Sequence, residues 1–588
     1  MEFPAACFWG KDYGFGPTGG SAMRLLVLTV AVLTTAAWAV DVEGGRGEPL
    51  PIGFTEEELT RLDEIGLGSP EPTSPPPDGT RNPGEFEAAT GVFIVYDPSS
   101  WSFGVPDQLM VDLSNDDELW VICESGSQSS AESDLIAAGV NMSNVSYLNA
   151  PLDSWWIRDY GPWFVHLEDG TQAIFNYDYN RPRPNDNDIP VVVGSEWGLD
   201  VYTSEVVHTG GNYMSGGLEQ AMSTELVYDE NGGNQDWVDT QMELYLGIDD
   251  YVTMEDPQSS YIDHIDCWGK ILSPTRVMVL EVPPSHPDYS GLESVADMLA
   301  NTQNPYGTYW DVYRVYSSGT EGYSNSLITN DNVYMPTWNT SNDSPAIIAY
   351  EEALPGYTVR GYYFSDFSNT DALHCRTRNV IDRYMLWINH LPVDSLQLPD
   401  SPVGIDALIR CHPDHSLTST TVYYRVGTSG SFTSLSMAST GADSFHADIP
   451  GQSQGSLIQY YVAASDNSGR NERHPRFAPD TWCHEYQVEQ TGSHEGREAV
   501  PGIRMADPAP NPFGDVTNLS VSLASGCDME LAVYDLSGRK IDVIYSGHSG
   551  AGAHVVSWSP SAEVPNGVYM VRLSSADGVL TRRVTLIR

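Results

Sequence analysis

The chain has 588 residues, with 28 Lys and Arg against 80 Asp and Glu, so its formal net charge is −52. A surface this negative repels phosphate backbones and anionic lipid, and the sequence has no basic patch, so nucleic-acid binding is not expected. Arginine-bearing peptides would be attracted to it, although the acidity also fits a salt-adapted or simply soluble secreted protein. Hydrophobic residues make up 40% of the chain, enough for buried cores in about three or four domains.

The only long apolar run, 25–37, follows Met23 and Arg24 and is followed by the small-x-small pattern Ala37-Trp38-Ala39. This pattern predicts a secretory signal peptide at 23–39, with translation starting at Met23. The run is too short to span a bilayer, and no other segment reaches about 18 continuous apolar residues. A secreted or cell-surface protein without a membrane span is therefore expected.

Residues 40–84 are rich in Gly and Pro, with one short helical stretch at 56–65, and we interpret them as a pro-segment or linker. From 85 to 390, short apolar strands alternate with helical periodicity, which predicts an α/β domain. The expected strands include 91–96, 119–123, 173–177, 277–282 and 332–335, and the expected helices include 135–138 and 292–299.

After Pro392 the helical signals disappear, and alternating strands at 421–426, 444–449 and 457–464 predict a β-sandwich over 392–489. A linker over 490–507 precedes a second all-β unit, 508–588, with a terminal hairpin at the turn Asn566-Gly567.

Six cysteines remain outside the signal region, too sparse for a disulfide scaffold and without metal-site spacing, so no metal or cofactor is expected. Cys411 with Cys483 is the one plausible disulfide, because both lie in one small domain.

Two polar clusters of the α/β segment contain arginine. The first, 155–163, surrounds Arg158 and Asp159 with three tryptophans; the alternative is an aromatic loop with a local ion pair. In the second, 180–185, two prolines favour an extended chain that places Arg181 and Arg183 on one face, where they suit a carboxylate or phosphate. The alternative there is a solvated loop.

Three more clusters carry reactive side chains. An extended segment 261–268 would place His264 and Asp266 on one side of a strand as an acid/base pair, unless the histidine is structural. Segment 321–327 offers the amide of Asn325. Segment 371–378 puts Cys375 among His374, Arg376 and Arg378, which would favour its thiolate; the alternative is a buried, inert cysteine.

Together these residues suit one reaction. Guanidinium is a planar cation whose donors match paired carboxylates, here Asp159 and Asp266. The Cys375 thiolate would attack the guanidinium carbon. His264 would protonate the departing ammonia and activate the water that hydrolyses the thiouronium adduct to a ureido product.

The motifs resemble those of the Porphyromonas-type peptidylarginine deiminases, relatives of the agmatine deiminases in the guanidine-modifying superfamily. The matching blocks span roughly 80–390 and occur in family order: Trp-Ile-Arg-Asp-Tyr-Gly-Pro-Trp, Asn-Arg-Pro-Arg-Pro-Asn, His-Thr-Gly-Gly-Asn, Asp-His-Ile-Asp, Tyr-Ser-Asn-Ser-Leu and Ala-Leu-His-Cys-Arg-Thr. The resemblance implies a pseudo-fivefold α/β propeller of βαβ units.

The resemblance also implies roles for individual residues. Cys375 is the implied nucleophile and His264 the general acid/base, while Asp159 and Asp266 grip the guanidinium and Asn325 assists. Trp156 and Tyr261 match residues that line the substrate channel. Arg181 and Arg183 match the pair that holds a substrate's C-terminal carboxylate in the peptide-specific branch. The segment Asp371-Ala372-Leu373, which replaces a Gly-rich stretch of agmatine enzymes, also favours that branch.

Outside the catalytic segment, 392–489 resembles the immunoglobulin-like domain of this family. Residues from 508 resemble the sorting domains of secretion systems, so the secretion machinery is an expected partner. The expected function is conversion of peptidylarginine, at peptide C-termini, to citrulline and ammonia. The alternatives are an agmatine deiminase that forms N-carbamoylputrescine and a catalytically idle surface binding module.

Overall fold

The computed structural model describes residues 48–588 except 98, 259–261, 394–395, 490–502, 507, 509, 512, 524–525, 536–538, 551, 562–563 and 576–577. The predicted signal peptide at 23–39, most of the predicted linker at 490–507 and Tyr261 therefore lie outside the described residues.

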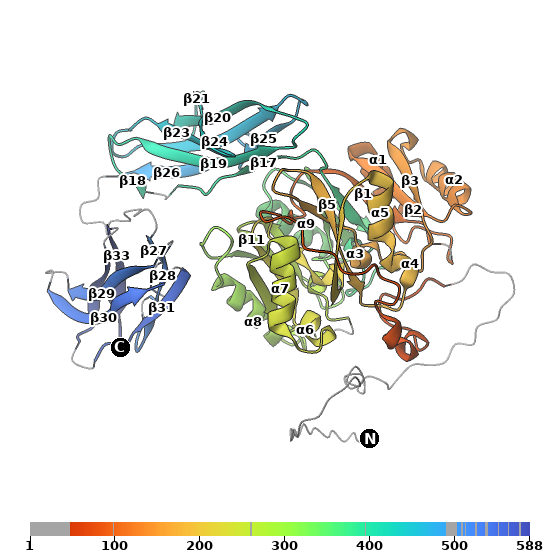
Figure 1. Ribbon diagram of the computed structural model, residues 1–588, viewed down its shortest axis with the longest axis horizontal. Helices are drawn as coiled ribbons and strands as arrows, with labels where there is room; N and C mark the ends of the chain where they lie inside the picture. The colour runs from red at the N-terminus through yellow and green to blue at the C-terminus, as the bar shows by residue number, and fades with distance from the viewer. Residues whose placement is uncertain are drawn as a thin grey trace, which may run out of the picture.

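Five sheets occupy the described part of 85–381 (Figure 1). One has the order β16-β1-β2-β3, with strands Arg378–Ile381, Ala89–Val95, Glu118–Cys123 and Val145–Asn149. The other four have three strands each: β4-β5-β6 (Trp163–His166, Gln172–Tyr179, Val201–His208), β7-β8-β9 (Met214–Ser215, Gln220–Thr224, Asp250–Met254), β10-β11-β12 (Gly269–Ser273, Arg276–Glu281, Asp311–Tyr316) and β13-β14-β15 (Leu327–Thr329, Asn332–Thr337, Thr358–Tyr363).

All five sheets share one topology. An antiparallel pair is followed by a parallel neighbour, and one or more helices lie in the crossover between the parallel strands. Such crossovers cover one face of a sheet with a helix. The crossover helices are α1 (Asp107–Asp116), α2 (Gln128–Ala138), α4 (Pro184–Asn187), α5 (Ile189–Trp197), α6 (Leu226–Glu230), α7 (Gln235–Leu246), α8 (Tyr289–Ala300) and α9 (Asp343–Ala353). The predicted α/β class is confirmed.

Hydrophobic periodicity located these elements well. The expected strands correspond to β1, β2, β5, β11 and β14, and the helix expected at 292–299 lies within α8. The buried residues of α8 are Leu292, Val295, Ala296 and Leu299, which are the residues that carried the periodic pattern. Their side chains pack in the largest hydrophobic core of the domain.

The four-stranded sheet β16-β1-β2-β3 is assembled from both ends of the domain. Strand β16 pairs antiparallel with β1, with Phe93 opposite Arg378, although the two strands lie far apart in sequence. Because β16 directly follows Cys375, this pairing brings the end of the domain back to its beginning and fixes the position of the cysteine.

Residues 48–81 pack against the α/β domain instead of forming a free linker. The backbone N–H of Thr73 donates to Thr203 O (3.0 Å), and Ile52 is 1% exposed within the main core. In place of the helix expected at 56–65, the chain forms two 3-10 turns, η1 (Glu58–Thr60) and η2 (Leu62–Glu64). The turns lie beside α4 in Figure 1.

Beyond Ile381, every described element is a strand. One sheet has the order β17-β19-β23-β22 (Leu386–Asn389, Val403–Cys411, Ser444–Ile449, Ala438–Gly441). A second has the order β18-β26-β24-β20-β21 with β25 beside β24 (Leu396–Gln397, His484–Val488, Leu457–Asp466, Leu417–Val426, Thr433–Ser436, Asn471–His474). Both surround one hydrophobic core. Cys411 and Cys483 are both free, so the predicted disulfide is wrong.

The last part of the chain forms two further sheets. They are β27-β28-β31 (Ile503–Met505, Thr517–Leu523, Gly552–Trp558) and β30-β29-β32-β33 (Lys540–Ser549, Cys527–Asp535, Gly567–Ser575, Gly578–Leu586). The terminal hairpin exists as β32 and β33, in which Ser575 pairs with Gly578. The prediction of a turn at Asn566-Gly567 is wrong, because Gly567 is the first residue of β32.

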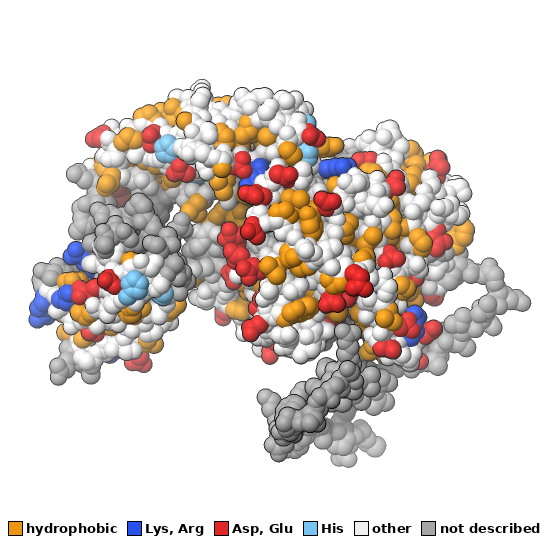
Figure 2. Space-filling model, viewed as in Figure 1, with side chains coloured by type: hydrophobic (Ala, Val, Ile, Leu, Met, Phe, Trp, Pro, Cys, Tyr) orange, Lys and Arg blue, Asp and Glu red, His pale blue; other side chains and the backbone are white. Residues whose placement is uncertain are grey.

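Acidic side chains outnumber basic ones on the face of the molecule shown in Figure 2, in line with the composition. None of the helices within the described residues combines the length and the apolar character that crossing a membrane would require.

Candidate active site

Each of the five sheets is preceded by a short turn that carries one residue of a common site. The turns are α3 (Ile157–Tyr160), η4 (Gly210–Asn212), η5 (Ile265–Cys267), the loop 322–326 and η6 (His374–Arg376). In this order they supply Asp159, Gly211, Asp266, Asn325 and Cys375, whose partners are described below. The repeated topology therefore gathers residues that are up to 216 positions apart, from 159 to 375.

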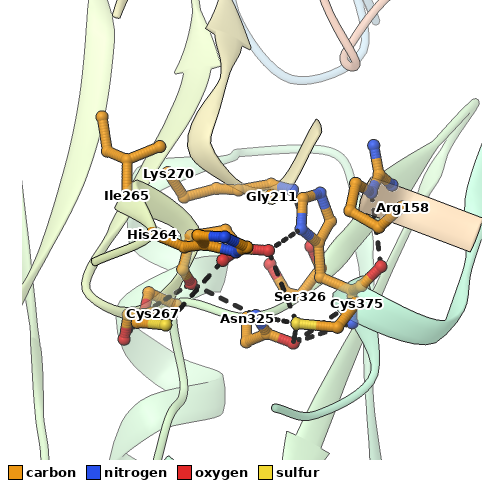
Figure 3. A network of polar contacts seen from close by, with 12 residues as sticks. Arg158, Gly211, His264, Ile265, Cys267, Lys270, Asn325, Ser326 and Cys375 are labelled. Atoms are coloured by element: carbon orange, nitrogen blue, oxygen red, sulfur yellow. Dashed lines mark hydrogen bonds and ion pairs between the residues drawn. The ribbon is translucent and has the colours of Figure 1, made fainter. Parts of the chain in front are cut away.

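The sulfur of Cys375 faces an amide and a carboxylate (Figure 3). Asn325 Nδ2 donates to Cys375 Sγ (3.2 Å), and Asp266 Oδ2 lies 3.6 Å from the same sulfur. The side chain of Cys375 has no exposed surface. Burial and the charge of Asp266 together raise the pKa of the Cys375 thiol well above its ordinary value.

The expectation that neighbouring cations favour the Cys375 thiolate is wrong. Arg376 donates to Gly104 O (2.6 Å) and pairs with Asp371 (2.7 Å), and Arg378 Nε donates to Pro162 O (3.1 Å). Residues adjacent in sequence point in different directions from a 3-10 turn, so their charges serve other contacts.

Asp266 is held by His374. Nδ1 of His374 lies 2.7 Å from Asp266 Oδ2, and Nε2 of the same ring lies 2.8 Å from Glu85 Oε2. Glu85 also pairs with Arg158 (3.0 Å) and with the buried amine of Lys270. Burial acts to raise the pKa of Asp266, but the hydrogen bond and charge of His374 outweigh it and lower that pKa.

Asp159 is the second carboxylate of the site. Its Oδ1 accepts a hydrogen bond from Gly211 N (3.1 Å), whereas its buried Oδ2 has no hydrogen-bond partner within the described structure. Burial, and then the charge of Asp266, raise the pKa of Asp159 to about 7. A cation between the two carboxylates would relieve both effects.

His264 lies beside Asp159, with Nδ1 3.7 Å from Asp159 Oδ1. Neither ring nitrogen has a hydrogen-bond partner among the described residues. Burial lowers the pKa of His264 to about 3, so the ring is a neutral base in this structure. The expected strand at 261–268 is wrong: His264 precedes the 3-10 turn η5, and this turn directs Asp266 toward His374 and Cys375.

Gly211 permits the close approach of these groups. A Cβ atom at this position would lie 2.6 Å from both Asp159 Oδ1 and His264 Nδ1. Any side chain there would displace both of them.

The predicted substrate-binding arginines are buried and occupied. Arg183 Nε lies 2.6 Å from Glu58 Oε1, and Arg181 Nε donates to Ile52 O (3.1 Å). The expected extended strand is also wrong, because Pro184 begins helix α4. Trp156 Nε1 donates to Leu50 O (2.8 Å).

The sequence patterns did not reveal the network behind Asp266. They indicated His374 only as a charge near Cys375, and they gave no role to Glu85, Lys270 or Arg158. One signal was available, since Lys270 is one of only three lysines in the chain and is fully surrounded by protein at 2% exposure. Within the described residues, no group of three or more His, Cys, Asp or Glu side chains could hold a metal ion.

The part of the chain that holds this site is similar to known proteins. Residues 103–380 match the family described as Porphyromonas-type peptidyl-arginine deiminase. A protein of Streptomyces avermitilis, provisionally named agmatine deiminase, is 23% identical over 350 residues, covering 52% of this chain and 98% of its own. A similarly named protein of Vibrio parahaemolyticus is 23% identical over 262 residues, covering 37% of this chain and 72% of its own.

Solved structures are similar over the same part of the chain. The agmatine deiminase of Enterococcus faecalis has a TM-score of 0.46 at 18% identity, over 52% of this chain and 97% of that one. A provisionally named arginine deiminase of Porphyromonas gingivalis has a TM-score of 0.45 at 17% identity, over 51% and 98%. Members of the matched family are hydrolytic deiminases of guanidino C–N bonds. The segment 103–380 of this chain is thus similar to the Porphyromonas-type peptidyl-arginine deiminase family.

Proposed function

We propose that this chain is a hydrolytic deiminase that converts arginine at the C-terminus of a peptide to citrulline and releases ammonia. The observation that carries the proposal is the convergence of a cysteine, a neutral histidine and two carboxylates in one buried site. These are Cys375, His264, Asp159 and Asp266.

Asp159 and Asp266 would bind the substrate guanidinium. Its five N–H donors need acceptors when it leaves water, and Asp159 Oδ2 is a buried acceptor without a partner within the described structure. The cation would lower the pKa of Asp159 from about 7 and offset the carboxylate charges that hold the Cys375 thiol protonated. Substrate binding would thereby prepare the nucleophile.

The reaction then proceeds in two steps. His264 takes the thiol proton, the sulfur of Cys375 forms a bond to the guanidinium carbon, and the proton passes from His264 to the departing nitrogen as the C–N bond breaks. A water molecule, deprotonated by the same ring, attacks the thiouronium carbon. The C–S bond breaks, the thiol regains its proton, and the ureido product leaves.

The choice of a peptide with a free C-terminus rests on Arg181 and Arg183. Both are buried, Arg181 acts on the pKa values of Asp159 and His264, and Arg183 already binds a carboxylate, that of Glu58. Agmatine has no carboxylate to place there. The agmatine reaction remains the alternative because the relatives carry that name, and the idle binding module is disfavoured by the intact Cys375 and His264.

The test is colorimetric detection of ureido product with four substrates in parallel: a peptide with C-terminal Arg, the same peptide amidated, free arginine and agmatine. We expect the free-carboxylate peptide to exceed the amidated one by about 10-fold or more in kcat/KM, the scale of one charge-assisted contact. The order of preference is the readout, so a low absolute rate does not obscure it. A preference for agmatine would show that agmatine, and not the peptide, is the substrate. Absence of product from all four substrates would reject deiminase activity.

The same proposal extends to the rest of the chain. The fivefold repetition of one sheet topology supports a propeller of five βαβ units. The apolar run at 25–37 supports secretion, the sheets of 386–488 support an immunoglobulin-like domain, and those from 503 onward support a sorting domain read by the secretion machinery.

A further inference from the structure

The segment 50–58 packs against a surface of the catalytic domain that contains Trp156, Arg181 and Arg183, called the groove below, and is held there chiefly through its backbone. Four successive carbonyl groups accept hydrogen bonds from three side chains: Leu50 O from Trp156 (2.8 Å), Pro51 O and Gly53 O from Arg183 (2.7 and 3.0 Å), and Ile52 O from Arg181 (3.1 Å). Carbonyl groups are common to every peptide. The groove therefore binds peptide backbone and does not depend on one sequence.

Two side chains anchor the segment at its ends. Ile52 is 1% exposed and packs in the main hydrophobic core, which also contains Trp156. Glu58, 5% exposed, places its carboxylate against Arg183 (2.6 Å). Between them, the Arg181 guanidinium stacks on the ring of Phe54 at 4.2 Å. The groove thus holds a backbone, an apolar side chain and a carboxylate at once.

The groove adjoins the catalytic centre. Trp156 precedes helix α3, which carries Asp159. The charge of Arg181 opposes the rise in the pKa of Asp159 and contributes to the fall in the pKa of His264, so its guanidinium lies near both groups. With the segment in place, Cys375, His264 and Asp266 have no exposed surface.

We infer that segment 50–58 is an internal occupant of the peptide-binding groove, which closes the catalytic centre until a substrate peptide displaces it. This inference rests on the proposed function and adds the regulation of the same site. Glu58 occupies the position at Arg183 that the substrate's carboxylate would take. A peptide with a free C-terminus competes for this cation, whereas an amidated peptide or agmatine brings no carboxylate to replace Glu58.

The test uses the full chain and measures the rate at which iodoacetamide alkylates Cys375, identified by mass spectrometry of the modified peptide. Glu58→Gln removes the charge of the anchor. The glutamine still accepts a hydrogen bond from Thr55 N, as Glu58 does at 2.7 Å, so the local turn is kept. We expect alkylation about 10-fold faster than in the wild type, the scale of one charge-assisted contact.

Glu57→Gln is the matched control, because Glu57 is the adjacent residue of the same type and its side chain is exposed. It should leave the rate at the wild-type value. Ile52→Ala, which weakens the apolar anchor without touching Arg183, should accelerate alkylation as Glu58→Gln does. Circular dichroism verifies that each variant is folded.

A synthetic peptide of residues 48–60 should slow the alkylation of the Glu58→Gln variant again, and the same peptide carrying Glu58→Gln should protect it less. The inference is overturned if both anchor variants react at the wild-type rate, or if the peptide gives no protection. Alkylation requires no turnover. If the alkylation rates follow these expectations but the chain shows no deiminase activity, the proposed function is rejected and the closure stands. If the chain is an active deiminase but the alkylation rates do not change as expected, the closure is rejected and the function stands.

Discussion

The imidazole of His374 lies 2.7 Å from Asp266, the carboxylate that faces the sulfur of Cys375. A residue that is adjacent to Cys375 in sequence thus acts on it through a carboxylate from another unit of the domain. His374 is a positioning residue, since it holds Asp266 and does not itself touch the sulfur.

His374→Ala should reduce kcat/KM for a C-terminal-Arg peptide by about 100-fold, because a misplaced carboxylate no longer aligns the guanidinium. The hydrogen bond from His374 lowers the pKa of Asp266, so its loss should raise that pKa and move the acidic limb of the kcat/KM profile to higher pH. The profile is measured between pH 4 and 8. A fall in rate with an unmoved acidic limb would assign His374 a purely structural role.

Cys375→Ala should lower kcat by at least about 10³-fold while the substrate still binds, because the carboxylates that hold the guanidinium remain. Turnover and peptide binding by calorimetry are measured together, on a chain that also carries Glu58→Gln so that the groove is accessible. Cys123→Ala, at a buried position of β2 away from the site, is the control and should keep the parent activity. Residual activity within tenfold of the parent would contradict the covalent mechanism.

Gly211→Ala should abolish activity while the protein stays folded. The new Cβ would lie 2.6 Å from Asp159 Oδ1 and His264 Nδ1, so both groups must move, and we expect a loss of about 100-fold or more in kcat/KM. Gly126→Ala, where a Cβ would meet no atom within 4 Å, is the matched control. Equal activity in the two variants would show that the site tolerates this displacement.

Asp159→Asn should change the pH dependence of stability. In the folded protein the pKa of Asp159 is raised to about 7 from 3.8. Between these values the folded state binds more protons than the unfolded state, so this group makes stability fall as the pH rises. The variant lacks this effect, and its unfolding temperature should fall less between pH 5 and pH 8 than that of the wild type.

The difference should correspond to about 1 kcal/mol or more of unfolding free energy, since one pKa unit is worth about 1.4 kcal/mol. Thermal unfolding at the two pH values measures it. Asp297→Asn, at an exposed position of α8, controls for the change in net charge. If Asp159→Asn loses as much stability between pH 5 and pH 8 as the wild type does, Asp159 is not strained by its burial.

Asp159→Asn should also lower kcat/KM, by an amount that corresponds to about 3 kcal/mol or more of transition-state stabilisation, because one partner of a buried guanidinium is lost.

The sequence by itself determined the periodic helices and strands and the identity of the reactive groups. Period-3.6 and period-2 patterns depend only on which side chains must leave water, so the amino-acid order alone locates α8, β1 and β23. The composition of the polar clusters indicated Cys375, His264, Asp159, Asp266 and Asn325, and all five contribute to the site described above.

The tertiary structure decided which charges meet. Short polar segments carry no periodic signal, so the 3-10 turns at His264 and Cys375 were not predictable, and these turns direct His374 to Asp266 while Arg376 and Arg378 point elsewhere. The ion pair between Glu58 and Arg183 joins residues 125 positions apart. A Gly/Pro-rich segment has too weak a local preference to reveal its partner, and only the closed fold of the domain provides the groove that holds it.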